Sequence, residues 1–298
     1  MPVVPGVRHR FLRVHGVRLH VAEAGDERAP AVLLLHGFPQ HWYVWRELIG
    51  PLARCRRVVA VDLRGFGWSD APARGYSTAE RVRDVLGVMD GLGIATADLV
   101  GHDWGAWLAF RLALDHPERV DRLVALSMAH PWPLQRHLAP TTWRWWVTAL
   151  FEVPGVGEWL LRRRPGLTGW LMSRDAAQPS VWSRALRDVY ACVAARPDRA
   201  RAGRRLHGGL VARDIPRLLL GRDRRRRYGV PTLVVVGDRD ALLAVAVLTV
   251  PAPRTDMITI RTVSGGHFVV DESPAEVTAA VLAHLTGARA RQAALPTE

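Results

Sequence analysis

Short apolar runs alternate with segments of helical spacing through the first 130 residues of the chain. Runs of this length between polar or glycine-rich segments are typical of buried strands. They stand at residues 17–22, 31–35, 58–61, 97–100 and 122–127. Apolar residues recur with the period of a helix between them, at residues 43–53, 78–92 and 106–114. This alternation predicts an α/β fold with a mostly parallel sheet and helices on both of its faces.

The alternation stops near His130. Residues 131–227 have helical spacing, are rich in tryptophan and arginine, and contain no run that is typical of a strand. Strand-like runs return at 231–236 and 257–263, and a last helix is expected from Ser273 to about His284. The sequence therefore predicts a core domain made of residues 1–130 and 228–298, with residues 131–227 inserted as a helical cap domain.

The net charge of +13 raises the question of a nucleic-acid partner. The densest basic run, RDRRRR at 222–227, stands just before an expected strand, where a solvated loop explains it better than a phosphate-binding patch. The chain contains no helix-turn-helix, zinc-finger or RNA-binding motif. We therefore expect no nucleic-acid partner.

The remaining composition points to a cytoplasmic protein without a membrane partner. No segment approaches the roughly 20 apolar residues of a membrane helix. The start, MPVVPGVRHRF, lacks the apolar core of a signal peptide. Cys55 and Cys192 are isolated, without the spacing of a metal site or a disulfide framework. We expect no metal and no cofactor, and the oligomeric state, a homodimer included, stays open.

The segment VGHDWGAW at residues 100–107 carries the clearest chemical signal. Asp103 stands between a strand-like run and a helical segment, with Gly101 and Gly105 two positions to either side. This pattern is typical of a nucleophile elbow, which commonly holds a serine. A carboxylate with a pKa of about 3.9 is already ionised at neutral pH. Its attack on a saturated carbon gives an ordinary ester, whereas attack on an ester gives an anhydride, so Asp103 predicts displacement at an sp3 carbon.

Two later loops supply an acid and a base. The motifs GDRD and SGGH each follow an expected strand, which places their side chains at the active edge of the sheet. We interpret His267 as the catalytic base and Asp240 as its partner, with Asp238 as the alternative acid. The backbone amides of Phe38, in an early LHGFP turn, and of Trp104 are expected to form an oxyanion hole.

Five motifs in this order resemble the α/β-hydrolases with an aspartate nucleophile, and among them the soluble epoxide hydrolases. They are HGFPQHWYVWR (36–46), DLRGFGWSD (62–70), GHDWGAW (101–107), GDRD (237–240) and GGHFVVDESP (265–274). The resemblance covers nearly the whole chain and implies the α/β-hydrolase fold, a cis peptide before Pro39 and a helical cap over the active site. It implies that an ester formed on Asp103 is hydrolysed by water that His267 activates.

The dehalogenases related to this family are the alternative enzymes. Haloalkane dehalogenases usually have Asn at the position of Phe38, and haloacetate dehalogenases have Arg at the positions of Trp104 and Trp107. Neither pattern is present in this chain, which favours an epoxide over a halide. The expected partners are a small hydrophobic electrophile and water.

The cap sequence departs from the epoxide hydrolases. Those enzymes have two cap tyrosines that polarise the epoxide oxygen, and the aligned positions here hold Val147 and His207. We expect both residues to line the substrate pocket together with Trp107, Trp146 and Tyr190, and His207 is the candidate acid. The replacement of both tyrosines also leaves open a repurposed enzyme or a non-catalytic binding protein.

Overall fold

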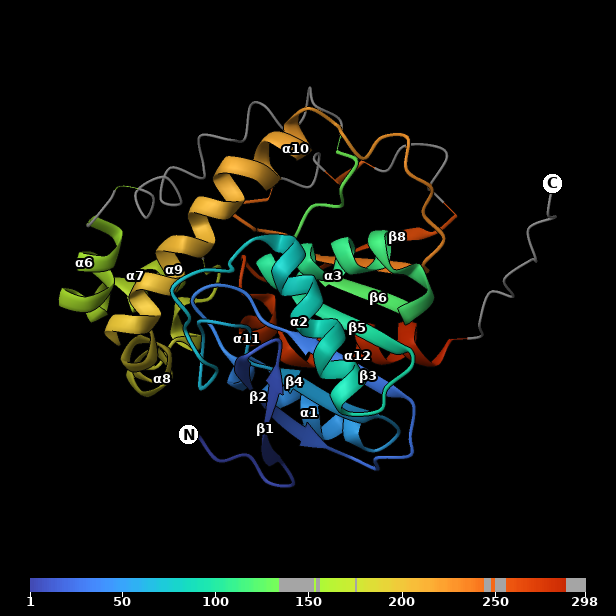
Figure 1. The fold of residues 1–298 in the computed structure, drawn as a ribbon, viewed down its shortest axis with the longest axis horizontal. Helices are drawn as coiled ribbons and strands as arrows, with labels where there is room; N and C mark the ends of the chain where they lie inside the picture. The colour runs from blue at the N-terminus through green and yellow to red at the C-terminus, as the bar shows by residue number, and fades with distance from the viewer. Residues whose placement is uncertain (134–152, 154–155, 175, 244–247, 250–255, 288–298) are drawn as a thin grey trace.

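The computed structural model describes residues 1–133, 153, 156–174, 176–243, 248–249 and 256–287. An eight-stranded sheet crosses the middle of the molecule in the order β1-β2-β4-β3-β5-β6-β7-β8 (Figure 1). The first two pairings, β1 with β2 and β2 with β4, are antiparallel, and all the others are parallel. The strands are β1 (Arg8–Val14), β2 (Val17–Ala24), β3 (Ala31–Leu35), β4 (Arg57–Val61), β5 (Ala97–His102), β6 (Val120–Leu126), β7 (Thr232–Gly237) and β8 (Ile258–Val263).

Helices cover both faces of the sheet, as the alternating pattern predicted. The side chains of β3 point to opposite faces in turn, so that Leu33 and Leu35 enter one apolar core while Val32 and Leu34 enter the other. The first core lies under α2 (Thr78–Gly91) and α3 (Trp104–Asp115). The second lies under η1 (Trp42–Trp45), α1 (Arg46–Ala53), α11 (Val269–Glu272) and α12 (Pro274–Thr286).

Along the chain, a group of helices comes between β6 and β7, and we call them the cap helices. They are α6 (Val156–Arg163), α7 (Pro165–Arg174), α8 (Arg184–Ala194), α9 (Pro197–Gly209) and α10 (Ile215–Leu219). A β-carbon added at Gly203 of α9 would lie 3.0 Å from the Phe38 ring, so α9 rests against the turn that follows β3. Figure 1 shows α6 to α9 grouped together to one side of the sheet. Among the described residues, no helix is long and apolar enough to cross a bilayer.

The expected strands agree with the observed ones to within two residues at each end, but the first strand, β1, was missed. Its sequence RHRFLRV is mostly exposed, and only its last residue, Val14, is buried. It forms the edge of the sheet, where charged side chains hinder pairing with another molecule. An exposed edge strand has no apolar run, so the pattern that found the buried strands could not find this one.

Candidate active site

The turn between β5 and α3 places Asp103 in a backbone conformation that residues other than glycine rarely adopt, with φ 51° and ψ −126°. The helix leaves this turn in close contact with the sheet. A β-carbon at Gly105 would lie 2.1 Å from the carbonyl oxygen of Leu35, and one at Gly101 would lie 2.5 Å from the Cα of Ala106. The small residues around Asp103 are therefore required for helix and strand to approach, which is the geometry of a nucleophile elbow.

The Asp103 carboxylate is buried and its two oxygens have different surroundings. The Phe38 backbone amide donates a hydrogen bond to Oδ2 at 3.0 Å. Oδ1 lies 3.7 Å from Nε2 of His267, which is an ion-pair distance rather than a hydrogen bond. A β-carbon at Gly37 would lie 2.6 Å from Oδ2, so only glycine lets the turn after β3 come this close to the carboxylate.

The imidazole of His267 lies between two carboxylates. Its Nδ1 is 3.2 and 3.3 Å from the two oxygens of Asp240, which is held in turn by the backbone amides of Leu242 and Leu243, both 2.9 Å from Oδ1. The alternative acid, Asp238, turns outward: it is half-exposed and accepts a hydrogen bond from the Gly265 amide. The structure brings together Asp103, His267 and Asp240, with Asp238 outside this cluster.

Electrostatics favours an ion pair at the centre of the cluster. Burial alone would lower the pKa of His267, but the charges of Asp240 and Asp103 outweigh it and raise the pKa well above its ordinary value. Burial alone would raise the pKa of Asp103, but His267 and the hydrogen bond from the Phe38 amide outweigh it and hold the pKa below its ordinary value. Asp103 is thus ionised at neutral pH beside a protonated His267.

Two further histidines fix the turns around the site. His36 donates from Nδ1 to the Gly37 carbonyl at 2.8 Å and accepts from the Leu63 amide at Nε2, which ties the turn after β3 to the turn after β4. Nδ1 of His102 lies 2.9 Å from Oε1 of Gln40, and Nε2 of His102 lies 3.0 Å from the carbonyl oxygen of His267. Burial lowers the pKa of His102 to about 4, so it is neutral and leaves the charge balance of the site unchanged.

The sequence did not single out a buried network behind His102. Gln40 donates to Asp271 at 3.0 Å, and Arg46 forms a 2.7 Å salt bridge with the same carboxylate. The Arg46 guanidinium also lies 3.5 Å from the hydroxyl of Tyr190, and this contact connects α8 to the core. Among the described residues, the Tyr190 hydroxyl contacts Arg46 and no member of the Asp103 cluster. Of these residues, Gln40 and Arg46 stand in the HGFPQHWYVWR motif, which was the only sequence signal for them.

His207 of α9 contacts the turn after β3. Its ring packs edge-on against the Phe38 ring, with 4.4 Å between the centroids. Nδ1 donates to the Gly203 carbonyl at 2.9 Å, so the neutral ring presents Nε2 as a hydrogen-bond acceptor. Burial lowers the pKa of His207, although the charge of Asp103 acts to raise it. The ring thus lies near the carboxylate but in a form that accepts a proton rather than gives one.

The other pocket candidates fall in two groups. Trp107 is buried in α3, where its indole nitrogen has no hydrogen-bond partner among the described residues. Trp146 and Val147 lie outside the described residues. No group of three or more histidine, cysteine or acidic residues in the described part of the chain is arranged to hold a metal ion.

Residues 30–274 match the family model described as alpha/beta hydrolase fold. The chain belongs to this family. The placement of a nucleophile elbow after β5, an acid after β7 and a histidine after β8 matches the chain order of catalytic groups in the α/β-hydrolase fold. The sequence-based expectation of the fold class is confirmed.

Several relatives of this α/β-hydrolase are named as epoxide hydrolases. It is 42% identical over 128 residues to epoxide hydrolase 3 of Xenopus tropicalis, a match that spans 42% of this chain and 35% of the relative, so about a third of that protein's length is covered. The crystal structure of Cfl2 from Burkholderia cenocepacia is 31% identical with a TM-score of 0.80, covering 93% of this chain and 95% of that one. Epoxide hydrolase A from Mycobacterium thermoresistibile is 26% identical with a TM-score of 0.77, covering 94% and 98%.

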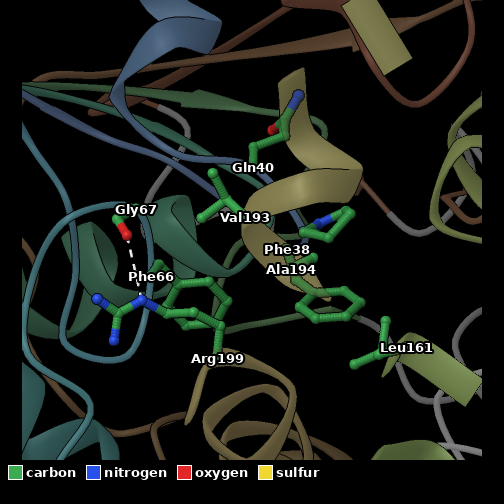
Figure 2. A pocket seen from close by; sticks show the side chains of 9 residues that line it. Phe38, Gln40, Phe66, Gly67, Leu161, Val193, Ala194 and Arg199 are labelled. Carbon is green, nitrogen blue, oxygen red and sulfur yellow. Dashed lines mark hydrogen bonds between the residues drawn. The ribbon is translucent and has the colours of Figure 1, made fainter. Parts of the chain in front are cut away.

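A small crevice opens between the core and the cap helices of this α/β-hydrolase (Figure 2). Its walls combine aromatic, aliphatic and polar residues: Phe38, Pro39, Gln40, Phe66, Gly67, Leu161, Val193, Ala194 and Arg199. The Arg199 guanidinium donates from Nε to the Gly67 carbonyl at 3.1 Å, which joins α9 to the turn after β4. The Phe38–Pro39 peptide is cis, as the resemblance implied. Phe38 connects the two regions, because its amide contacts Asp103 while its ring lines the crevice.

Proposed function

We propose that this α/β-hydrolase opens epoxides to vicinal diols through an ester formed on Asp103. The observation that carries the proposal is the placement of the buried Asp103 carboxylate, which the Phe38 amide holds at 3.0 Å and from which His267 lies 3.7 Å away. A serine would need a base before it could attack, but this carboxylate is already charged. The names of its relatives also support an epoxide as the substrate.

In the first step, Oδ1 of Asp103 attacks a ring carbon of the epoxide. This oxygen is the attacking one because Oδ2 is held by Phe38. The new carbon–oxygen bond forms as the ring carbon–oxygen bond breaks, and the resulting alkoxide takes, through water, the proton that the His267 imidazolium gives up. Neutral His207 cannot give this proton, because its single N–H donates to Gly203. The proposal therefore favours an epoxide that opens readily, such as one on a benzylic carbon.

In the second step, the loss of the Asp103 charge changes the basicity of His267. Ester formation removes one of the two carboxylates that stabilise the imidazolium, so the imidazole loses its proton more easily. Neutral His267, oriented by Asp240, then takes a proton from water, and the hydroxide attacks the Cγ of Asp103. The amides of Phe38 and Trp104 would hold the oxyanion. Its collapse breaks the ester bond, the leaving oxygen takes the proton from His267 to complete the diol, and the acid form of Asp103 then returns a proton to His267.

Hydrolysis of styrene oxide tests the proposal. Wild-type protein should produce phenylethanediol, Asp103→Asn should not, and the control Asp238→Asn should retain activity because this acid lies outside the cluster. Single turnover in heavy-oxygen water should place the label in the peptide that contains Asp103, since water attacks the enzyme ester. Label only in the diol would overturn the ester mechanism, and release of halide from 1-chlorobutane or chloroacetate without any diol would identify a dehalogenase instead.

A further inference from the structure

Glu272 is a buried acid whose carboxylate is surrounded by backbone amides. It is the last residue of α11, shortly after His267 in the chain, and is only 5% exposed. Its oxygens accept four hydrogen bonds, at Oε2 from the amides of Ala177 (2.7 Å), Gln178 (3.0 Å) and Gly266 (3.0 Å), and at Oε1 from the amide of Phe268 (3.2 Å). Hydrogen bonds to a carboxylate are stronger than those between neutral groups, so this acid is a firm junction.

The four amides come from two distant parts of the chain. Gly266 and Phe268 are the neighbours of His267 on either side. The other two amides lie among the cap helices, between α7 and the 3-10 helix η4 (Pro179–Val181). Glu272 therefore holds a segment of the cap and both flanks of the candidate base with one carboxylate.

Apolar packing joins the same two parts. The Phe268 ring lies edge-on against the Trp182 ring, with 5.4 Å between the centroids. It belongs to one buried cluster with Met172 of α7 and Tyr190 of α8. The His267 ring is 5.2 Å from the Phe268 ring, again centroid to centroid. A displacement of the cap would therefore reach the backbone of His267 through side chains as well as through Glu272.

We propose that Glu272 is a positioning residue that aligns His267 for hydrolysis of the ester and ties this alignment to the position of the cap. This inference rests on the proposed function and adds a residue to it. Ester formation depends mainly on Asp103, which the Phe38 amide holds without Glu272. Ester hydrolysis depends on a base within hydrogen-bond reach of the attacking water, so it is the step that misalignment of His267 slows most.

Glu272→Gln tests the inference, because it nearly preserves the shape of the side chain but leaves one acceptor oxygen for four amides. Single turnover of styrene oxide, followed by rapid quenching and mass spectrometry of the intact protein, separates free enzyme from the Asp103 ester. Ester hydrolysis should slow by about 10- to 100-fold, while ester formation changes by less than about fivefold. Protein with the added mass of the substrate should therefore accumulate, and kcat should fall more than kcat/KM.

Glu276→Gln is the matched control. Glu276 lies on α12, and its exposed carboxylate accepts a hydrogen bond from the Ser264 amide at 3.3 Å, in the loop of His267 but not beside it. Both rates should stay within about twofold of wild type, because this bond is exposed. Equal slowing of both steps in Glu272→Gln, or the same result for both variants, would overturn the inference and would indicate a general effect on the fold.

Amide hydrogen exchange distinguishes failure of this inference from failure of the proposed function, because it needs no substrate. In wild type the amides of Ala177 and Gln178 should be protected, and free exchange there would overturn the inference even if the variant did not fold. Glu272→Gln should speed exchange by at least about tenfold at one or more of the four amides, and unchanged exchange at all four would also overturn it. A protein that forms no ester would refute the proposed function, whereas exchange would still decide whether Glu272 joins the cap to the loop of His267.

Discussion

The charge of Asp103 controls the protonation of His267, and replacing Asp103 by asparagine should lower the pKa of that imidazole. The asparagine side chain has nearly the same shape as aspartate and carries no charge, so it also imitates the ester intermediate. The geometry sets the size of the effect. At 3.7 Å and an effective dielectric constant of about 20, two unit charges interact by about 4.5 kcal/mol.

That energy corresponds to about 3 pKa units, at 1.36 kcal/mol per unit. It is a ceiling, because 3.7 Å joins the two nearest atoms and both charges are delocalised. We therefore expect the pKa of His267 to fall by about 1 to 3 units in Asp103→Asn. Because the folded-state pKa of His267 is raised by its carboxylates, a fall widens the pH range in which the imidazole is neutral and able to accept a proton from water.

Nuclear magnetic resonance titration of protein labelled with 15N at histidine measures this pKa directly. The His267 signal is assigned by its loss in His267→Gln. Asp238→Asn provides a control, because it removes a carboxylate that is two residues from Asp240 in the sequence but lies outside the cluster. The control should leave the pKa within about half a unit of wild type, because its charge is half-exposed and screened. A pKa of His267 that stays unchanged or rises in Asp103→Asn would refute the ion pair and the second step of the mechanism.

Three further predictions concern the scaffold. Gly105→Ala should lower the free energy of unfolding, measured in urea, by about 1 to 3 kcal/mol, because its β-carbon would lie 2.1 Å from a carbonyl oxygen. The control Gly50→Ala in α1 meets open space and should not destabilise the protein. Equal stabilities of the two variants would contradict the close approach at Gly105. Ser77→Ala should cost about 1 kcal/mol by removing the capping box of α2, measured in the same way. Tyr190→Phe should change styrene oxide turnover by less than about fivefold, since its hydroxyl contacts Arg46 rather than Asp103; abolished turnover would place it in the mechanism.

The sequence was sufficient for the parts of the fold that are buried on both faces. Strands β3, β4 and β5 have every residue buried, and such strands appear as continuous apolar runs. Strand β1 was not recoverable, because it pairs with β2 at the exposed edge and its polar residues face solvent. Its partner strand follows it directly along the chain across a two-residue turn at His15 and Gly16, but β1 has no apolar run that would mark it as a strand.

The proximity of the three candidate catalytic residues could be predicted for a topological reason. Strands β5, β7 and β8 run parallel in one sheet, so the loops that follow them open at the same edge. A sequence that places Asp103, Asp240 and His267 directly after three such strands therefore implies their proximity before any contact is known. The cap residues have no such constraint. Whether His207 or Tyr190 faces Asp103 depends on how α8 and α9 pack on the core, and helical spacing does not specify that packing.

Arg81 shows why a charged residue inside the core escapes sequence analysis. The chain has 41 basic residues, and arginine at helical spacing is ordinarily a solvated residue on an outer helix face. In α2, Arg81 and Arg83 are two positions apart, yet the first is buried and the second is exposed. The difference comes from which face of the helix meets the core, where α2 packs against α3 and β1, and the sequence offers arginine on both faces. Burial is thus set by how the helix packs on the core, and helical spacing alone does not single out the buried arginine.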